Sequence, residues 1–391
     1  MDGWNYLQKR KTIVVTGLPG NEDDSEFSKR VWLAVLGTAS RGGRCDVQLL
    51  TSALQGQPRD CLFTPGRRQE FVSALVPLFE AKDNIEENVG SFLIAVQQFH
   101  NAALASNNGI CRLGHPHALL YVAAGVALQY KLENSSHVCT LLKSIHKCDG
   151  GLDKVFIPPL LGHRLTHVLS GWRPHQKDGD NPKNLLFWVI HGTCVGLKVG
   201  SPPKKIQDAP MPSLQNTVPL TIAIQADNVQ AVKYLLMCGA DAHTASRNSP
   251  LLAVLSKLSA HARATLATRP TCDCFSYPDP ENGSRLSAHE MGHCLKLCPC
   301  ELQWPIKWPP ACVEILKRLM SCVVVRRLPS NADIVHPRIV NDGLIPAPTL
   351  KGMCRVVIRR QLSSSWNLPH GVTKLPIPTK LRQYIALQED A

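Results

Sequence analysis

The amino-acid sequence predicts an all-α protein, and three observations lead there. Apolar residues recur at the three-to-four-residue spacing of one helix face in seven segments, which are 26–36, 47–54, 69–81, 85–105, 116–130, 137–146 and 185–197. No comparable stretch alternates apolar and polar residues as a half-buried strand would. Connectors that carry Pro, Gly and Lys lie between the segments and are predicted to be loops, notably 150–184 and 198–215.

Length and composition indicate a globular protein of the cell interior. Its 391 residues, 44% of them apolar, are enough to bury a sizeable core. Met1 to Lys11 are followed by no apolar run, so no secretory signal is expected, and the most apolar stretches are shorter than the about 20 residues of a membrane span. We expect the cytoplasm, with the nucleus as an alternative, and no membrane partner. Most cysteines lie in helical runs and are expected to be reduced and packed, for example Cys111, Cys139, Cys194, Cys238, Cys312 and Cys322.

The chain is basic, with a formal net charge of +13, and the charge is uneven. From Lys317 onward there are twelve Lys and Arg against four Asp and Glu, so this end is expected to favour acidic partners. Aromatic residues make up only 6% and are not interleaved with the basic ones, which argues against a stacking platform for nucleic acid.

One segment resembles an ankyrin repeat. From Asn216 the chain reads NTVPLTIAIQADNVQAVKYLLMCGAD, with Pro219-Leu220 where the family has its T-P-L-H turn. Pro219 suits a first helical turn, and Gly239 is expected to end the second helix because glycine adopts a left-handed conformation most cheaply. The core faces of the two helices are predicted to comprise Leu220, Ala223, Val229, Val232, Leu235 and Leu236.

A second unit begins at Pro250, 31 residues after Pro219 rather than the usual 33. Its first helix is predicted from Pro250 to about Ala262, but a run that suits the partner helix starts only at Cys312, so we infer an insertion at about 263–310. The pair 116–130 and 137–146 resembles a degenerate earlier repeat. Because ankyrin helices need neighbours, the N-terminal helices and the C-terminal segment are expected to cap a short stack.

The C-terminal segment contains an amphipathic helix. Leu350, Cys354 and Ile358 are four residues apart and form one apolar stripe, which Val357 and Leu362 widen. The other face is predicted to carry Lys351, Arg355, Arg359 and Arg360. Such a stripe packs inside its own protein or lies in a groove of a partner, and periodicity does not choose between the two.

Two short motifs make this segment resemble a SOCS box. Thr349, Leu350, Cys354 and Ile358 match the family's elongin-binding pattern of a small residue, Leu, Cys and an aliphatic residue at that spacing. The run Leu375, Pro376, Ile377, Pro378 starts 17 residues after Ile358 and resembles the L-P-Φ-P element that selects cullin-5. Its prolines exclude a helix through Pro376 and predict an extended loop. A last helix is then expected to pack back on the box through Leu381, Tyr384 and Ile385.

Together the motifs resemble the ankyrin repeat and SOCS box family. The resemblance implies a substrate-recognition adaptor, without catalytic residues or cofactor, that binds elongin B, elongin C and cullin-5 with its RING partner and presents a protein substrate for ubiquitination. The implied domains are an N-terminal helical region at 1–110, an ankyrin-like region at 111–325 with its best repeat at 216–248, and a three-helix SOCS box at 345–391. An ankyrin scaffold that recruits no ligase is the alternative.

The insertion is rich in ligands that zinc prefers, namely Cys272, Cys274, His289, His293, Cys294, Cys298 and Cys300. Their spacing differs from the paired C-x2-C of zinc fingers, so a thiol-rich loop is the alternative to a structural zinc site. His289-Glu290-Met291-Gly292-His293 also matches the H-E-x-x-H pattern of zinc peptidases. Gly292 weakens a short helix, and no third His or carboxylate ligand follows at a recognised spacing, so peptidase activity is disfavoured.

Overall fold

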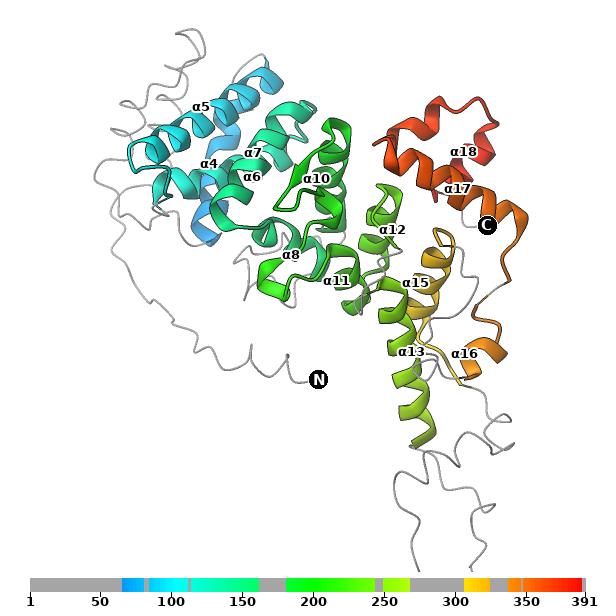
Figure 1. The fold of residues 1–391 in the computed structure, drawn as a ribbon. Coiled ribbons are helices and arrows are strands. Elements are labelled where there is room, and N and C mark those ends of the chain that lie inside the picture. The colour runs from blue at the N-terminus through cyan, green and yellow to red at the C-terminus, as the bar shows by residue number, and fades with distance from the viewer. Residues whose placement is uncertain are drawn as a thin grey trace, which may run out of the picture.

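The computed structural model describes residues 65–80, 84–111, 114–161, 181–242, 249–267, 306–323, 337–345 and 347–388. Within these ranges the chain is mostly helical, which confirms the predicted all-α class. The described ranges contain one small sheet, in which β1 (Lys198–Val199) pairs antiparallel with β2 (Lys204–Lys205). The helices form one elongated row, with the N-terminal helices at one end and the C-terminal box at the other (Figure 1).

The N-terminal end is a cluster of helices that pack on their neighbours in the sequence. They are α4 (Pro65–Glu80), α5 (Ile85–Ala105), α6 (His115–Gln129), α7 (Ser135–Asp149) and α8 (Asp153–Leu161). Helix α6 lies at the centre, in contact with α4, α5 and α7, and it is buried along nearly its whole length from His117 to Ala127. This explains why its sequence is apolar on every side rather than on one stripe.

The two helices predicted within residues 216–248 are present as α11 (Pro219–Gln225) and α12 (Val229–Met237), which follow α10 (Asn181–Val195). Pro219 occupies the first turn of α11, and the side chain of Asn228 caps α12 by accepting a hydrogen bond from the Ala231 N–H at 3.0 Å. The Asn228 amide also donates to the carbonyl of Leu160 at 2.9 Å, which ties α12 to the end of α8. The predicted core residues are buried except Val229, which is half-buried against the core.

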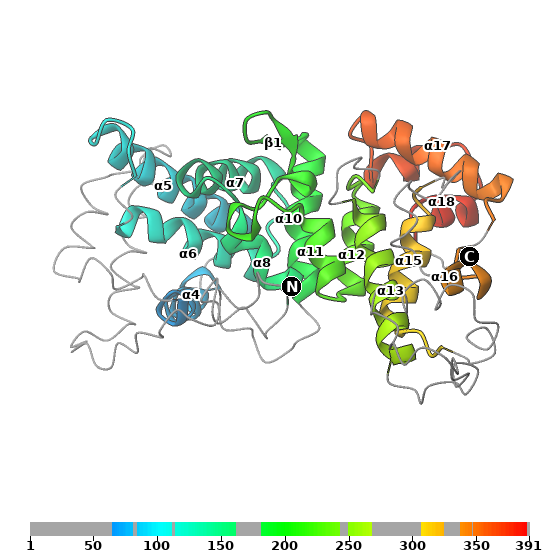
Figure 2. The same ribbon diagram turned by 60° about the horizontal axis from the view of Figure 1, so that its bottom comes forward.

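The second unit is formed by helices far apart in the sequence. Helix α13 (Pro250–Ala267) packs against α15 (Pro310–Met320), although residues 268–309 separate them in the sequence. Helix α15 also contacts α12, so α11, α12, α13 and α15 lie side by side (Figure 2). The partner helix predicted to start at Cys312 therefore completes the pair, and Cys312 itself is buried.

Two connectors that the sequence predicted as loops contain regular structure. Helix α8 lies inside 150–184 despite Pro158 and Pro159, because its Val155, Phe156 and Leu160 are buried in the core and this packing outweighs the breaker signal. The connector 198–215 holds the small sheet and the 3-10 turns η2 (Ile206–Asp208) and η3 (Pro212–Leu214). Short apolar segments of this kind carry no periodicity long enough to detect.

The C-terminal box comprises α17 (Leu350–Ser364), the 3-10 turn η7 (His370–Lys374) and α18 (Thr379–Ile385), and α16 (Pro337–Asn341) precedes it. It has a small core of its own, formed by Leu368, Val372, Ile385 and Ala386. Tyr384 and Ile385 pack inward as predicted, whereas Leu381 is 41% exposed and does not. In the described residues no helix combines the length and apolar character that crossing a bilayer requires.

Gly239 has the left-handed conformation that the sequence predicted, with φ of +81°, and it lies against the box. A Cβ at this position would stand 2.9 Å from Ser363 Oγ, so Gly239→Ala adds a collision to the backbone strain. We expect the free energy of unfolding to fall by about 1–3 kcal/mol, measured by chemical denaturation. Gly343→Ala is the control, because Gly343 also has a positive φ but no neighbour within 4 Å of the added Cβ. An equal loss in both variants would contradict the contribution of the box contact.

Candidate functional site

The candidate site is helix α17, and its first turn is defined by a side-chain cap. Thr349 Oγ1 accepts a hydrogen bond from the Gly352 N–H at 3.1 Å, which satisfies one of the free donors of the helix N-terminus. Thr349 and Leu350, two of the residues predicted to bind elongin, therefore stand at a fixed helix start. Both are exposed.

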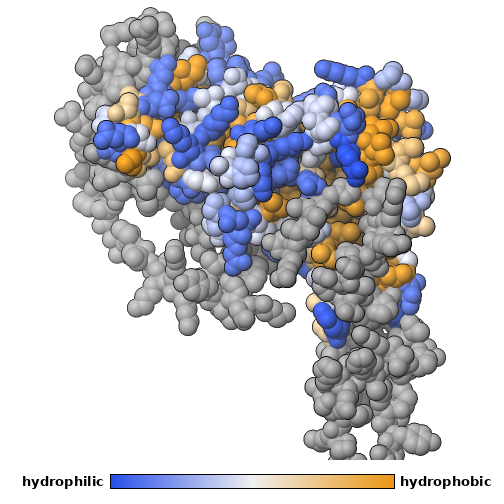
Figure 3. Space-filling model, viewed as in Figure 1, coloured by the Kyte–Doolittle hydropathy of each residue, from blue (hydrophilic) through white to orange (hydrophobic). Residues whose placement is uncertain are grey.

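One face of α17 is apolar and open to solvent. Leu350 is 74% exposed, Val357 is 64% exposed, and Met353 and Cys354 are exposed as well. We call these four residues the outward stripe, and hydrophobic residues gather over this part of the box in Figure 3. Ile358 and Leu362 are instead half-buried on the core of the box. Part of the predicted stripe therefore faces outward and part packs inside the box.

The opposite face of α17 was predicted to carry four basic residues, and they differ in burial: Lys351 and Arg360 are exposed, whereas Arg355 and Arg359 are buried. Arg355 is 8% exposed, Arg359 is 5% exposed, and Val356 between them is also buried. The guanidinium groups of Arg355 and Arg359 donate to backbone carbonyls at the ends of helices in the stack and in the box, instead of to water. Arg355 Nε donates to the carbonyl of Ser321 at 3.0 Å, and the Arg355 guanidinium lies 4.0 Å from the centre of the Tyr384 ring.

Arg359 joins two helices at once. Its Nη1 donates to the carbonyl of Ile385 in the last turn of α18 at 2.7 Å, and its Nη2 donates to the carbonyl of Leu236 in the last turn of α12. The last carbonyls of a helix have no partner within it and carry its negative dipole end, so a cation with several N–H donors suits them. The two arginines thus fasten the box to the stack and leave the outward stripe uncovered by described residues.

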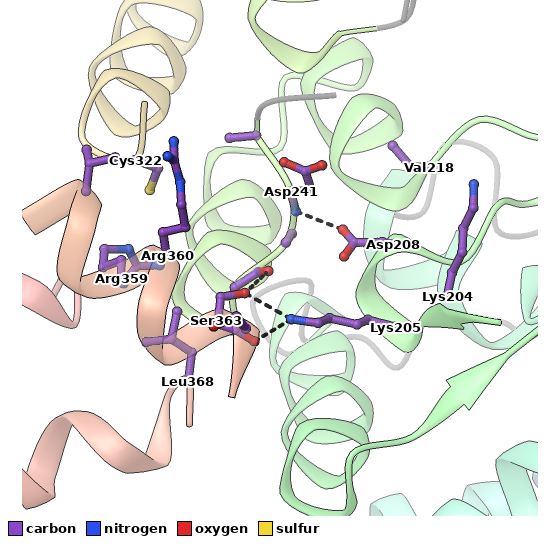
Figure 4. Close-up of a pocket in the computed structure, with 15 residues that line it drawn as sticks. Lys204, Lys205, Asp208, Val218, Asp241, Cys322, Arg359, Arg360, Ser363 and Leu368 are labelled. Atoms are coloured by element: carbon purple, nitrogen blue, oxygen red, sulfur yellow. Dashed lines mark hydrogen bonds between the residues drawn. The ribbon is translucent and has the colours of Figure 1, made fainter. Parts of the chain in front are cut away.

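A second set of contacts lies between the stack and α17, around a cavity of about 680 Å³ (Figure 4). Lys205 Nζ donates to Ser363 Oγ at 3.1 Å and to the Ser363 carbonyl, and Ser363 Oγ donates to the Gly239 carbonyl at 3.2 Å. Asp208 accepts a hydrogen bond from the Asp241 N–H at 2.8 Å, yet burial raises the pKa of its carboxyl to about 6. The contacts of Ser363 with Lys205 and Gly239 fix the orientation of α17 on the stack.

The predicted cullin element has an alternating arrangement. Leu375 and Ile377 pack partly against the core of the box, whereas Pro376 and Pro378 are exposed. Pro378 precedes α18 as its cap residue, so the element leads directly into that helix. Arg382 on α18 donates to the Thr373 carbonyl at 2.9 Å and joins α18 to η7. The prolines are therefore presented on an anchored loop.

The zinc candidates of the insertion lie outside the described residues, as does the H-E-x-x-H motif. They are Cys272, Cys274, His289, His293, Cys294, Cys298 and Cys300. The two arginines that fasten the box went unrecognised in the sequence, because basic residues on a helix are usually solvated. Arg355 and Arg359 are four residues apart with apolar Val356 between them. This spacing is the feature of the sequence that could have indicated a buried face.

Comparison with known proteins agrees with this geometry. Residues 347–386 match the family model of the SOCS box. Ankyrin repeat and SOCS box protein 17 from Canis lupus familiaris is 27% identical over 85 residues, a match that spans 20% of this chain and 29% of that relative. No solved structure matches this chain. The C-terminal segment is therefore a SOCS box, and this chain is similar over part of its length to a protein of the ankyrin repeat and SOCS box family.

Proposed function

We propose that this chain is the substrate-recognition adaptor of a ubiquitin ligase that contains elongin B, elongin C, cullin-5 and a RING protein. The observation that carries the proposal is the outward stripe on a helix matched to the SOCS box. An exposed apolar helix face with anchors at i, i+3, i+4 and i+7 suits the groove of a partner protein. Large exposed apolar side chains that gather on one helix are a usual mark of such an interface.

Elongin C is the partner proposed for the outward stripe, with Thr349, Leu350, Cys354 and Ile358 as the contact residues. The helix needs no rearrangement to bind, because Arg355 and Arg359 already hold it on the stack with the stripe outward. A binding surface that is ordered before association avoids the entropy cost of ordering. Ile358 is half-buried, so its contribution is to position the stripe as well as to contact its lower edge.

The ankyrin-like stack is proposed to select the protein substrate, and ubiquitin transfer belongs to the partner enzymes. The stack is joined to the box through contacts from α12 and β2, so a substrate on the stack would be held at a defined distance from the elongins. Defined placement is what an adaptor contributes to a transfer reaction, because it raises the effective concentration of the target.

Reconstitution tests the proposal directly. The full chain is co-expressed with elongin B and elongin C, purified, and mixed with cullin-5 bound to its RING partner, and the complexes are measured by size-exclusion chromatography with light scattering. We expect a ternary complex with the elongins and a larger complex once the cullin is added. A chain that stays monomeric beside the elongins would favour the ankyrin scaffold instead.

The cullin element allows a separate prediction. Replacing Pro376 and Pro378 with alanine leaves the half-buried Leu375 and Ile377 in place but removes two exposed contacts and the stiffness of the loop. We expect cullin-5 affinity to fall roughly tenfold, about 1.4 kcal/mol, while elongin binding is unchanged. Lys380→Ala, on an exposed neighbouring residue, is the control. The affinities for cullin-5 and for the elongins are measured by interferometry. Loss of both affinities in the proline variant would contradict separate binding roles for the two motifs.

The substrate is best sought with a point variant rather than a truncation. Removing the box would leave the Leu236 and Ser321 carbonyls without Arg359 and Arg355 and would destabilise the stack. A full chain with Leu350→Ser and Cys354→Ser should keep the stack and lose the ligase. Proteins that accumulate on this variant, compared with the unaltered chain, are the candidate substrates.

A further inference from the structure

Four metal-binding side chains meet at the N-terminal end of the molecule, far from the box. They are His100 on α5, Cys111 in the segment after α5, His117 in the first turn of α6 and Cys148 in the last turn of α7. One ligand atom of each lies within 4.8 Å of the others, and both histidines are buried. We call this set the Cys2His2 cluster.

Three of the separations between ligand atoms in the cluster are close to those of a tetrahedral metal site. Cys148 Sγ lies 3.2 Å from His100 Nε2, Cys111 Sγ lies 3.6 Å from His117 Nδ1, and Cys111 Sγ lies 3.7 Å from His100 Nε2. Zinc binds Cys sulfur at about 2.3 Å and His nitrogen at about 2.0–2.1 Å, so two ligands at a tetrahedral angle stand roughly 3.3–3.8 Å apart. The three separations therefore leave room for one zinc ion between the four atoms.

The second ring nitrogen of His117 has the partner that metal-bound histidines usually have. His117 Nε2 lies 3.3 Å from Asp149 Oδ1, while Nδ1 faces the cluster. Asp149 is anchored by the Tyr121 hydroxyl, which donates to Oδ2, and by Lys154 Nζ at 3.1 Å. A carboxylate at this position selects the tautomer with Nδ1 free to bind metal and makes the ring a stronger donor to it.

We propose that the Cys2His2 cluster is a structural zinc site. Four protein ligands complete the tetrahedron and leave no open position for a substrate, which is the arrangement of structural rather than catalytic zinc. His100, Cys111 and His117 line a cavity of about 190 Å³, through which an ion can reach the site. The metal would join the ends of α5, α6 and α7 and thereby stiffen the cap of the stack. This proposal is independent of the ligase function.

A disulfide between Cys111 and Cys148 is the competing explanation. It accounts for the two sulfurs, but it assigns nothing to the two buried histidines that point at them or to the Asp149 contact. The four ligands are spread from residue 100 to residue 148 and include no C-x2-C pair. No zinc-binding sequence motif therefore predicts the site.

The test uses the full chain purified with and without a zinc supplement. The zinc content per protein molecule is measured by inductively coupled plasma mass spectrometry. The insertion also contains cysteines, so the quantity that matters is the difference between variants. We expect Cys111→Ser with Cys148→Ser to lose about one equivalent of zinc, as one site predicts. The control is Cys194→Ser, which replaces an exposed cysteine outside the cluster and should leave the zinc content unchanged. Equal zinc in both variants would overturn the proposal, as would an unsupplemented protein that contains a Cys111–Cys148 disulfide and takes up no zinc at this site after reduction.

A second variant keeps the test valid if the double cysteine variant fails to fold. Asp149→Asn keeps all four ligands and removes the negative charge that orients His117 and pairs with Lys154. We expect its zinc dissociation constant, measured by chelator competition, to rise about 10–100-fold with an unchanged circular dichroism spectrum. Substituted cobalt(II) should give the visible absorption of a tetrahedral site with two thiolates in the unaltered chain and lose it in the cysteine variant. A six-coordinate cobalt spectrum in the unaltered chain, or unchanged zinc affinity in Asp149→Asn, would count against the site.

Discussion

Replacing Leu350 and Cys354 with serine is expected to abolish co-purification with elongin B and elongin C while the fold stays intact. Burial of a leucine side chain contributes about 1.5–3 kcal/mol, and the smaller thiol adds roughly 1 kcal/mol. Loss of both contributions corresponds to a dissociation constant for the elongins that is roughly 10²-fold to 10³-fold higher. An increase of this size prevents retention of the complex in affinity purification. Leu350 is 74% exposed in the free chain, so the same change should alter the stability of the chain by less than about 0.5 kcal/mol.

The matched control is Val195→Ser at the end of α10. Val195 is 48% exposed and lies on the stack rather than on the box, so elongin binding should be unaffected. Both variants are measured by titration with the purified elongin pair and by thermal denaturation. If the Leu350 and Cys354 variant bound elongin normally, α17 would not be the contact helix, and the ligase proposal would fail with it.

Much of the helical layout could be predicted from sequence, because long helices with one buried face repeat their apolar residues often enough to be read. Helix α5 has the predicted bounds, Ile85–Ala105, and its start is marked by the capping residue Asn84. Gly239 marked the end of α12 for an equally local reason. Helix α8 was missed because its nine residues include two prolines, and only the burial of its apolar side chains reveals why it is stable.

The functional surface was predictable in part. The spacing of Leu350, Cys354 and Ile358 predicted a stripe, but which of them face solvent depends on what packs against the other side of the helix. That other side is held by Arg355 and Arg359, whose carbonyl partners come from residues more than 20 positions away in the sequence. The Cys2His2 cluster was hidden for the same reason, since three helices must pack before its ligands meet.

The second large effect is expected for Arg359→Met, which keeps the length of the side chain and removes its donors. The Ile385 carbonyl would then be buried without its Arg359 partner, and the Leu236 carbonyl would keep only its hydrogen bond from the Gly239 N–H at 2.9 Å. Each hydrogen bond to a charged group contributes about 1.5–3 kcal/mol, and removal of the buried charge offsets part of that loss. We expect the free energy of unfolding to fall by about 2–4 kcal/mol, which lowers the melting temperature of a chain of this length by roughly 2–5 °C.

Two further variants separate the role of Arg359 from that of positive charge in general. Arg359→Lys keeps the charge but has a single ammonium group, which cannot point at two carbonyls on different helices with the geometry of a guanidinium, so it should recover less than half of the loss. Arg360→Met removes the charge from the exposed neighbouring residue and should cost less than about 0.5 kcal/mol. If Arg359 instead stabilised the chain only through its positive charge, Arg359→Lys would restore full stability and Arg360→Met would be as damaging as Arg359→Met. A stability order in which Arg359→Met is lowest, Arg359→Lys is intermediate and Arg360→Met is close to the unaltered chain follows only if one side chain joins the box to the stack.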